Sequence, residues 1–249
     1  MSKINAGCCG WPVARSRYFQ RFSTLEITSS FYRLPRVSTG ERWRKEAPKD
    51  FVFALRSWQR ITHPGTSPTY ERLGGKMSDR TRARLGHFKP SDEVASAWED
   101  TLAVARALEA GFILFQTPAS FYPNADHLRD MYRFFRGLKR GGAIFVWEPR
   151  GESWTPELVR KVCRDLDLVH ATDPFKSQPL HGSVRYFRLH GKRGEIGSVY
   201  EPEYTQEQLR QIPGFCDGKP SYVYFNNRSM WADANQFQQS LGSKMFVGA

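Results

Sequence analysis

The chain has 249 residues, of which 40% are hydrophobic and 14% aromatic, a composition typical of globular proteins. No stretch approaches the roughly 18 consecutive apolar residues of a membrane-spanning helix. The start, MSKINAGCCGWP, lacks the apolar segment of a secretory signal. We therefore expect a cytoplasmic protein without a membrane partner. With 37 Lys and Arg against 25 Asp and Glu, the net charge of +12 favours an anionic partner, although such charge also serves solubility alone.

Short β-branched or aromatic runs recur along the chain, and most are followed by residues that start helices, which is the pattern of repeated βα units. The eight runs are INAGCC from Ile4, TLEITSS from Thr24, FVFALRS from Phe51, FILFQT from Phe112, IFVWEP from Ile144, LVHATD from Leu168, VRYFRLH from Val184 and SYVYFNN from Ser221. Eight such units in a chain of this length predict an α/β fold, a single (β/α)8 TIM barrel over residues 1–249, rather than an open sheet.

The segments between the runs carry helix signals. Ser38 with Glu41 and Thr205 with Gln208 have the spacing of a capping box, which predicts that helices begin just after Ser38 and Thr205. Residues 94–110 place apolar side chains on one stripe of an amphipathic helix.

Two connections depart from a regular barrel. More than 50 residues separate the third and fourth runs, so residues 59–90 form an insertion, and because it follows a strand we expect it at the C-terminal mouth of the barrel as a positively charged lid. Its basic residues are Arg60, Arg72, Lys76, Arg80, Arg82, Arg84 and Lys89. After the sixth run only DPFKSQPLHGS precedes the seventh, so the sixth helix should be reduced or missing.

Polar side chains recur where the runs end. In RYFRLHG, the alternation of a strand places Tyr186, Arg188 and His190 on one face. In a barrel covered by helices this polar face points inward. Other runs end in the same way, with Glu26, Arg56, Gln116, Glu148 followed by Arg150, Asp173 and Asn226. Barrel active sites are assembled from the C-terminal ends of several strands, so the recurrence predicts a site there.

Seven motifs, in order through nearly the whole chain, resemble those of the domain of unknown function 72 family, also called YecE-like. They are GCCGW (7–11), LEITSSFYRLP (25–35), FVFALRSWQRITH (51–63), LFQTPASF (114–121), WEPRGESW (147–154), RLHG (188–191) and YFNN (224–227). The resemblance implies a TIM barrel, and the activity of the family has not been established in general. It also implies a cleft lined by Glu26, Tyr32, His63, Gln116, Glu148, Arg150, Asp173, Arg188, His190 and Asn226.

The sequence departs from the pattern of that family at two positions in these motifs. Thr28 stands where asparagine is commoner, and Arg56 stands where lysine is commoner. Arginine at position 56 argues against a mechanism that needs a Schiff-base lysine.

The residues at the strand ends suit chemistry on an anionic substrate. Arg150 and Arg188 offer planar donors for phosphate or carboxylate, and we expect them to bind substrate together with Tyr32, His63, Gln116 and Asn226. Acid and base roles fall to Glu26, Glu148, Asp173 and His190. The sequence therefore favours an enzyme, a hydrolase, lyase or isomerase, that acts on a phosphate-bearing or other anionic small molecule, without naming the reaction or the oligomeric state.

Several alternatives remain open. Glu148 and Arg150 could form a structural ion pair. Glu148, Asp173 and His190 could hold a metal, but two arginines nearby would repel a dication, so metal and cofactor use stay undecided. The rival function is a nucleic-acid-binding, nucleolytic protein that uses the basic insertion, and a third is a scaffold without catalysis.

Overall fold

The computed structural model describes residues 3–73, 77–191 and 203–243, and within these ranges eight parallel strands form a nearly closed ring. The strands are β1 (Ile4–Cys8), β2 (Thr24–Ile27), β3 (Val52–Arg56), β4 (Phe112–Gln116), β5 (Ile144–Glu148), β6 (Val169–Thr172), β7 (Arg185–Leu189) and β8 (Ser221–Phe225). They pair in the order β1-β8-β7-β6-β5-β4-β3-β2. A single parallel bridge between Cys9 and Glu26 brings β1 and β2 together, and the predicted TIM barrel is confirmed.

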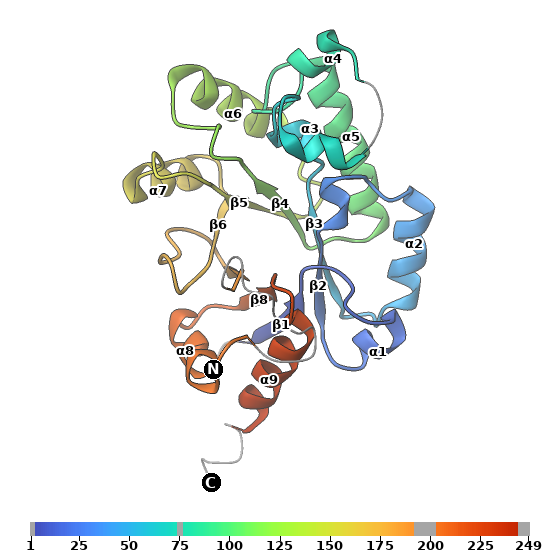
Figure 1. The fold of residues 1–249 in the computed structure, drawn as a ribbon, viewed down its shortest axis with the longest axis vertical. Coiled ribbons are helices and arrows are strands. Elements are labelled where there is room, and N and C mark those ends of the chain that lie inside the picture. Colours follow the sequence, from blue (N-terminus) through green and yellow to red (C-terminus); the bar gives the residue numbers. More distant parts are fainter. Residues whose placement is uncertain (1–2, 74–76, 192–202, 244–249) are drawn as a thin grey trace.

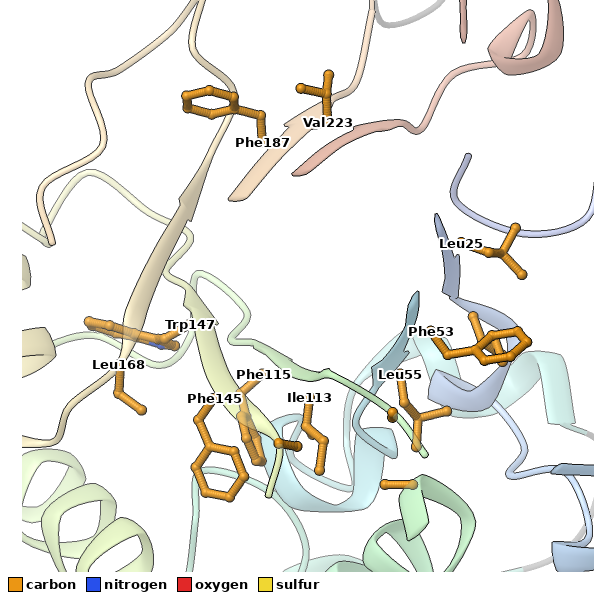
Figure 2. Close-up of a cluster of buried hydrophobic side chains, with 14 of the residues drawn as sticks. Leu25, Phe53, Leu55, Ile113, Phe115, Phe145, Trp147, Leu168, Phe187 and Val223 are labelled. Carbon is orange, nitrogen blue, oxygen red and sulfur yellow. The ribbon is translucent and has the colours of Figure 1, made fainter. Parts of the chain in front are cut away.

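Side chains along each strand alternate between two buried faces, which explains the nearly continuous apolar runs in the sequence. The inner face carries Ala54, Leu114, Val146, Ala171 and Tyr186, which pack together inside the ring. The outer face carries side chains that point toward the helices, as Figure 2 shows for Leu25, Phe53, Leu55, Ile113, Phe115, Phe145, Trp147, Leu168, Phe187 and Val223. The barrel interior is therefore filled by side chains, and it is not a channel.

Helices surround the strands (Figure 1). The α-helices of five residues or more are α1 (Arg15–Phe19), α2 (Val37–Glu46), α4 (Asp79–Ala83), α5 (Asp92–Ala107), α6 (Ala125–Gly137), α7 (Pro156–Asp165), α8 (Gln206–Phe215) and α9 (Met230–Ser243). Short turns of helix are η1 (Ser29–Phe31), α3 (Gln59–Thr62) and η2 (Pro68–Leu73). Among the described residues, no helix is both long and apolar enough to cross a bilayer.

The two expected capping boxes differ in outcome. Thr205 and Gln208 form a reciprocal capping box at the start of α8, as predicted. The prediction at Ser38 is wrong, because α2 already begins at Val37 and Ser38 lies within its first turn. The cap is Arg36, whose extended backbone turns its carbonyl toward the N–H groups of the next residues. The helix therefore starts without a side-chain cap.

The segment between β3 and β4 contains α3, η2 and α4 and returns to α5. Its end is tied to α3, because the N–H of Phe88 donates to the carbonyl of Ile61 at 3.0 Å. Phe88 is buried against Phe121, with ring centroids 5.3 Å apart. Arg84 pairs with Asp92 and Glu93 of α5. The side chains of Arg72 and Lys76 lie outside the described residues.

No helix follows β6 in the fully described segment between Asp173 and Val184, which confirms the prediction of a missing sixth helix. A loop takes its place between α7 and α8 (Figure 1). The loop is fixed to β6, because the N–H of His170 donates to the carbonyl of His181 at 3.0 Å and the N–H of Leu180 donates to Nδ1 of His170 at 3.2 Å. The barrel is therefore covered unevenly at this flank.

Candidate functional site

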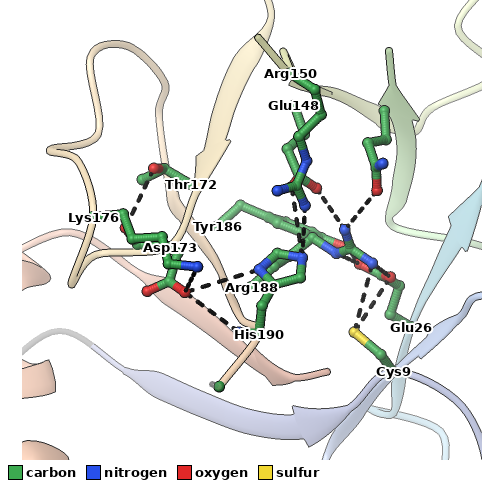
Figure 3. Close-up of polar contacts among 12 residues, drawn as sticks. Cys9, Glu26, Glu148, Arg150, Thr172, Asp173, Lys176, Tyr186, Arg188 and His190 are labelled. Carbon is green, nitrogen blue, oxygen red and sulfur yellow. Dashed lines mark hydrogen bonds and ion pairs between the residues drawn. The ribbon is translucent and has the colours of Figure 1, made fainter. Parts of the chain in front are cut away.

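Arg188 lies at the centre of a buried polar network at the C-terminal ends of the strands (Figure 3). Its Nε and Nη2 donate to the two carboxylate oxygens of Glu26 at 3.0 and 2.8 Å. Its Nη1 donates to Glu148 at 2.5 Å and to Gln116 at 3.0 Å. The hydroxyl of Tyr186 donates to Glu26 at 2.7 Å. The side chains of Arg188 and Glu26 are both 0% exposed, so neither reaches solvent.

The charged groups of this network keep one another in their charged forms. Burial by itself raises the pKa of Glu148, but the nearby Arg188, Arg150 and His190 outweigh burial and lower that pKa to about 2. Burial likewise disfavours the charged form of Arg188, but Glu26 and Glu148 raise the pKa of its guanidinium well above the usual value. Glu148 and Arg188 are therefore both charged at neutral pH.

His190 follows β7 and lies between two carboxylates. Nη2 of Arg150 is 2.7 Å from Nε2 of His190 and also pairs with Glu148. Because a guanidinium only donates hydrogen bonds, Nε2 must be the acceptor, and in the neutral ring the proton is on Nδ1. Nδ1 is 3.9 Å from Oδ2 of Asp173, and Nε2 is 3.7 Å from Oε1 of Glu148. The ring thus presents a basic nitrogen toward Arg150 and a donor toward Asp173.

Asp173 follows β6 and holds the other side of His190. Its Oδ2 accepts the backbone N–H of His190 at 3.3 Å, and its Oδ1 accepts the N–H of Phe175 at 3.2 Å. Burial by itself raises the pKa of Asp173, but these contacts and Lys176 outweigh it and lower the pKa. Asp173 is therefore an ionised carboxylate that holds the backbone of His190 and lies 3.9 Å from Nδ1 of its ring, too far for a hydrogen bond.

A cavity of about 240 Å³ opens beside the ends of β5, β6 and β7. Its charged and ionisable lining consists of Glu148, Arg150, Asp173, His170, Lys176 and His190. Apolar walls come from Trp154 and Val159 on one side and Leu180 on the other. Because His170 and Thr172 lie on the outer face of β6, the cavity extends from the end of the barrel to the flank where the sixth helix is missing.

Three sequence-predicted residues lie outside this network. The ring of His63 contacts Phe31, with centroids 4.6 Å apart, and burial with the nearby Arg56 lowers its pKa to about 3. Tyr32, at the end of η1, accepts a hydrogen bond from Trp58 on its carbonyl at 3.3 Å. Asn226 follows β8, and among the described residues its side chain makes no hydrogen bond. The remaining seven predicted residues are joined by direct contacts.

Two charged residues of the region were not assigned to the site from the sequence. Lys176 lies in the loop after β6, where no sequence pattern marked a ligand-facing position, and its Nζ is 3.8 Å from Oδ2 of Asp173. Arg56 ends β3 on the inward face. The sequence marked Arg56 as a polar strand end, like Arg188, but gave it no role in the site.

The acidic and histidine side chains do not form a metal site in the part of the chain that the structure describes. There, no group of three or more His, Cys, Asp or Glu is arranged to hold a metal ion. The space between Glu26 and Glu148, where two carboxylates could share a cation, is occupied by the guanidinium of Arg188.

Comparisons with known proteins agree with the fold. The family described as "Protein of unknown function DUF72" matches residues 14–247. UPF0759 protein YunF of Bacillus subtilis is 22% identical over 90% of this chain and 84% of its own. A DUF72 family protein from Enterococcus faecalis superposes with a TM-score of 0.71 at 18% identity, covering 97% of this chain and 98% of that one. A protein with a xylose isomerase domain from Salmonella typhimurium has a TM-score of 0.55 at 11% identity, with 97% of each chain covered.

Proposed function

The chain belongs to the DUF72 family of proteins of unknown function, and from that premise we propose that it binds an anionic small molecule in the cavity beside β5, β6 and β7, where His190 transfers a proton. One observation carries the proposal: His190 lies at the cavity, between Asp173 on one ring nitrogen and Arg150 with Glu148 on the other. A histidine that lies between a carboxylate and an ion pair at the wall of a cavity is suited to acid–base catalysis.

The positive charge for the ligand comes from Arg150 and Lys176. Their side chains are 31% and 59% exposed and line the cavity, whereas Arg188 is buried and its guanidinium is already held by two carboxylates. A guanidinium and an ammonium on one cavity wall suit a phosphate or carboxylate group. Arg188 is thus a positioning residue that keeps Glu148 ionised and in place.

Binding and proton transfer are coupled at Arg150. In the structure Arg150 donates to Nε2 of His190 and so occupies the lone pair of that nitrogen. An anion that takes over the guanidinium frees Nε2 to accept a proton from the ligand. Glu148, ionised because its pKa is about 2, then stabilises the imidazolium. Proton transfer of this kind serves isomerisation, elimination and hydrolysis alike.

Calorimetric titration with inorganic phosphate and fructose 6-phosphate tests the binding step. We expect Arg150→Gln to weaken both by about tenfold or more, because a charge-assisted hydrogen bond is lost. The control is Arg129→Gln, which removes an exposed arginine that pairs with Asp126 and Asp130 on α6. Equal affinities in Arg150→Gln and the wild type, or no binding of either probe, contradict the proposal.

Hydrogen exchange tests the catalytic step. Sugar phosphates incubated with the protein in deuterated water should acquire deuterium at a carbon-bound position, detected by mass spectrometry, and His190→Asn should abolish the exchange while phosphate still binds. If the sugar phosphate acquires deuterium at the same rate with His190→Asn as with the wild type, His190 does not transfer the proton.

Nucleic-acid binding remains the second candidate, supported by the net charge of +12. Part of the charge in residues 59–90 is engaged within the protein, because Arg84 pairs with Asp92 and Glu93 and Arg82 donates to the carbonyl of Gly65. Titration with duplex DNA between about 50 and 200 mM salt separates the two functions, since binding through many phosphates weakens steeply with salt.

A further inference from the structure

Arg56 ends β3 at the C-terminal end of the barrel and faces inward, because it alternates with the interior residue Ala54. Its guanidinium carbon is 3.6 Å from the centroid of the Phe31 ring, the closest stacking contact of an arginine among the described residues. The Nε atom is buried without a hydrogen-bond partner. The side chain is therefore held in place by an aromatic ring rather than by polar partners.

Arg56 also has no carboxylate partner in the described ranges. The fully enclosed arginines differ in this respect, since Arg185 pairs with Asp217 and Arg188 pairs with Glu26 and Glu148. Burial, and then repulsion from Arg188, lower the pKa of Arg56 to about 10, and the more distant Glu26 and Glu148 offset this only in part. An enclosed guanidinium without a counter-ion is costly, and a bound anion would remove that cost.

We infer that Arg56 is a second anion-binding position, and that the ligand of the proposed site carries two anionic groups. The inference rests on the proposed function, in which Arg150 and Lys176 hold the first group. Arg56 on β3 and Glu148 with Arg150 at the end of β5 are separated by β4 alone. Two interstrand spacings of about 4.8 Å separate the ends of β3 and β5 by about 10 Å.

The ligand class is therefore a small molecule with a phosphate or carboxylate at each end of a short polar chain, such as a sugar bisphosphate. Gln116 of β4 lies between the two positions. Its Oε1 accepts from Arg188, and its amide NH2 makes no hydrogen bond to a described residue, so a donor is available to the middle of the ligand.

The test compares fructose 1,6-bisphosphate, fructose 6-phosphate and inorganic phosphate as probes in calorimetric titrations at low ionic strength. We expect the wild type to bind the bisphosphate at least tenfold more tightly than the monophosphate. Arg56→Gln should reduce bisphosphate affinity to that of the monophosphate and leave unchanged the phosphate binding that depends on Arg150. Arg56→Lys, which keeps the charge, should retain part of the difference. Arg136→Gln, which removes an exposed arginine stacked on Tyr132 of α6, should change nothing.

The outcomes separate the two proposals. Equal affinity of the wild type for bisphosphate and monophosphate, or an Arg56→Gln variant that keeps the bisphosphate preference, overturns the second position while the first still stands. Unchanged phosphate binding in Arg150→Gln overturns the first position instead. Thermal unfolding of Arg56→Gln serves as a check of folding, and if that variant is unfolded, Arg56→Lys and the probe series in the wild type decide.

Discussion

Arg188 shows how one buried residue organises the others. Its guanidinium holds Glu26 through two hydrogen bonds and Glu148 through one, and solvent does not reach Arg188 or Glu26. Removing the guanidinium leaves two carboxylates facing each other without a cation, which costs more than the pair itself contributes to stability.

We therefore expect Arg188→Met to lower the free energy of unfolding by about 3–5 kcal/mol, measured by urea denaturation. The matched control on the same strand is Arg185→Met, because Arg185 pairs with Asp217, which is 77% exposed. That change should cost about 1 kcal/mol, since water can replace the partner of Asp217. A cost for Arg188→Met no larger than for Arg185→Met would show that the network does not depend on the guanidinium.

The alternation of side chains along a strand was sufficient to place Tyr186, Arg188 and His190 on one inward face. It could not show which inward residues remain accessible, because that depends on partners from other strands. Arg188 was expected to bind substrate, yet Glu26 of β2 and Glu148 of β5 enclose it. Lys176 was missed because loop residues carry no periodicity.

At the scale of single elements, a substitution at the start of α8 can show whether its capping box stabilises this barrel. Thr205→Ala removes a hydroxyl that accepts the N–H of Gln208 at 3.2 Å, and we expect a loss of about 1 kcal/mol in the free energy of unfolding. The control is Ser38→Ala, because Ser38 lies inside α2 and caps no helix. If both changes have the same effect in urea denaturation, the cap contributes nothing.

All eight strands were predictable because each is an apolar run bounded by polar or glycine-rich segments. The beginnings of helices were less predictable. The same spacing of residues that forms a capping box at Thr205 fails at Ser38, since the helix is already capped by the backbone of Arg36, two residues earlier. Local sequence offers several starting points, and the packing of the helix on the barrel selects one.

At the scale of the whole molecule, two buried histidines and one half-buried histidine make the fold sensitive to acid. Burial lowers the pKa of His63 to about 3 and those of His87 and His170 to about 4, with neighbouring charges adding to the effect at His63 and His87. Below the unfolded pKa of about 6.5, the unfolded chain takes up protons that the folded protein does not. The stability of the fold therefore decreases as the pH falls from 6.5 toward 4.

The urea midpoint should thus decrease between pH 7 and pH 5, a range above the usual pKa values of the carboxylates. The triple variant His63→Gln, His87→Gln and His170→Gln should show a flatter dependence on pH than the wild type. A wild-type midpoint that is the same at both pH values would mean that these histidines are protonated in the folded protein.

The missing sixth helix was predictable from two prolines and a short connection, but the cavity that results from it was not. Its shape depends on α7, on the outer face of β6 and on the loop, which meet only in three dimensions. Sequence therefore locates the charged end of the barrel more reliably than the space beside it.

The loop that replaces this helix also bears on how a bound molecule leaves. A wall made of a helix opens only when a whole packed apolar face separates from the barrel. This wall is held by a few hydrogen bonds, such as those from Leu180 to His170 and from Lys219 to the carbonyl of Gly182, and by the packing of Phe175 and Leu180. Opening it leaves every strand in register. We expect release of a bound molecule to be governed by this one flank, so that the lifetime of the complex varies with the length and sequence of residues 174–183 while the side chains at the strand ends stay in place.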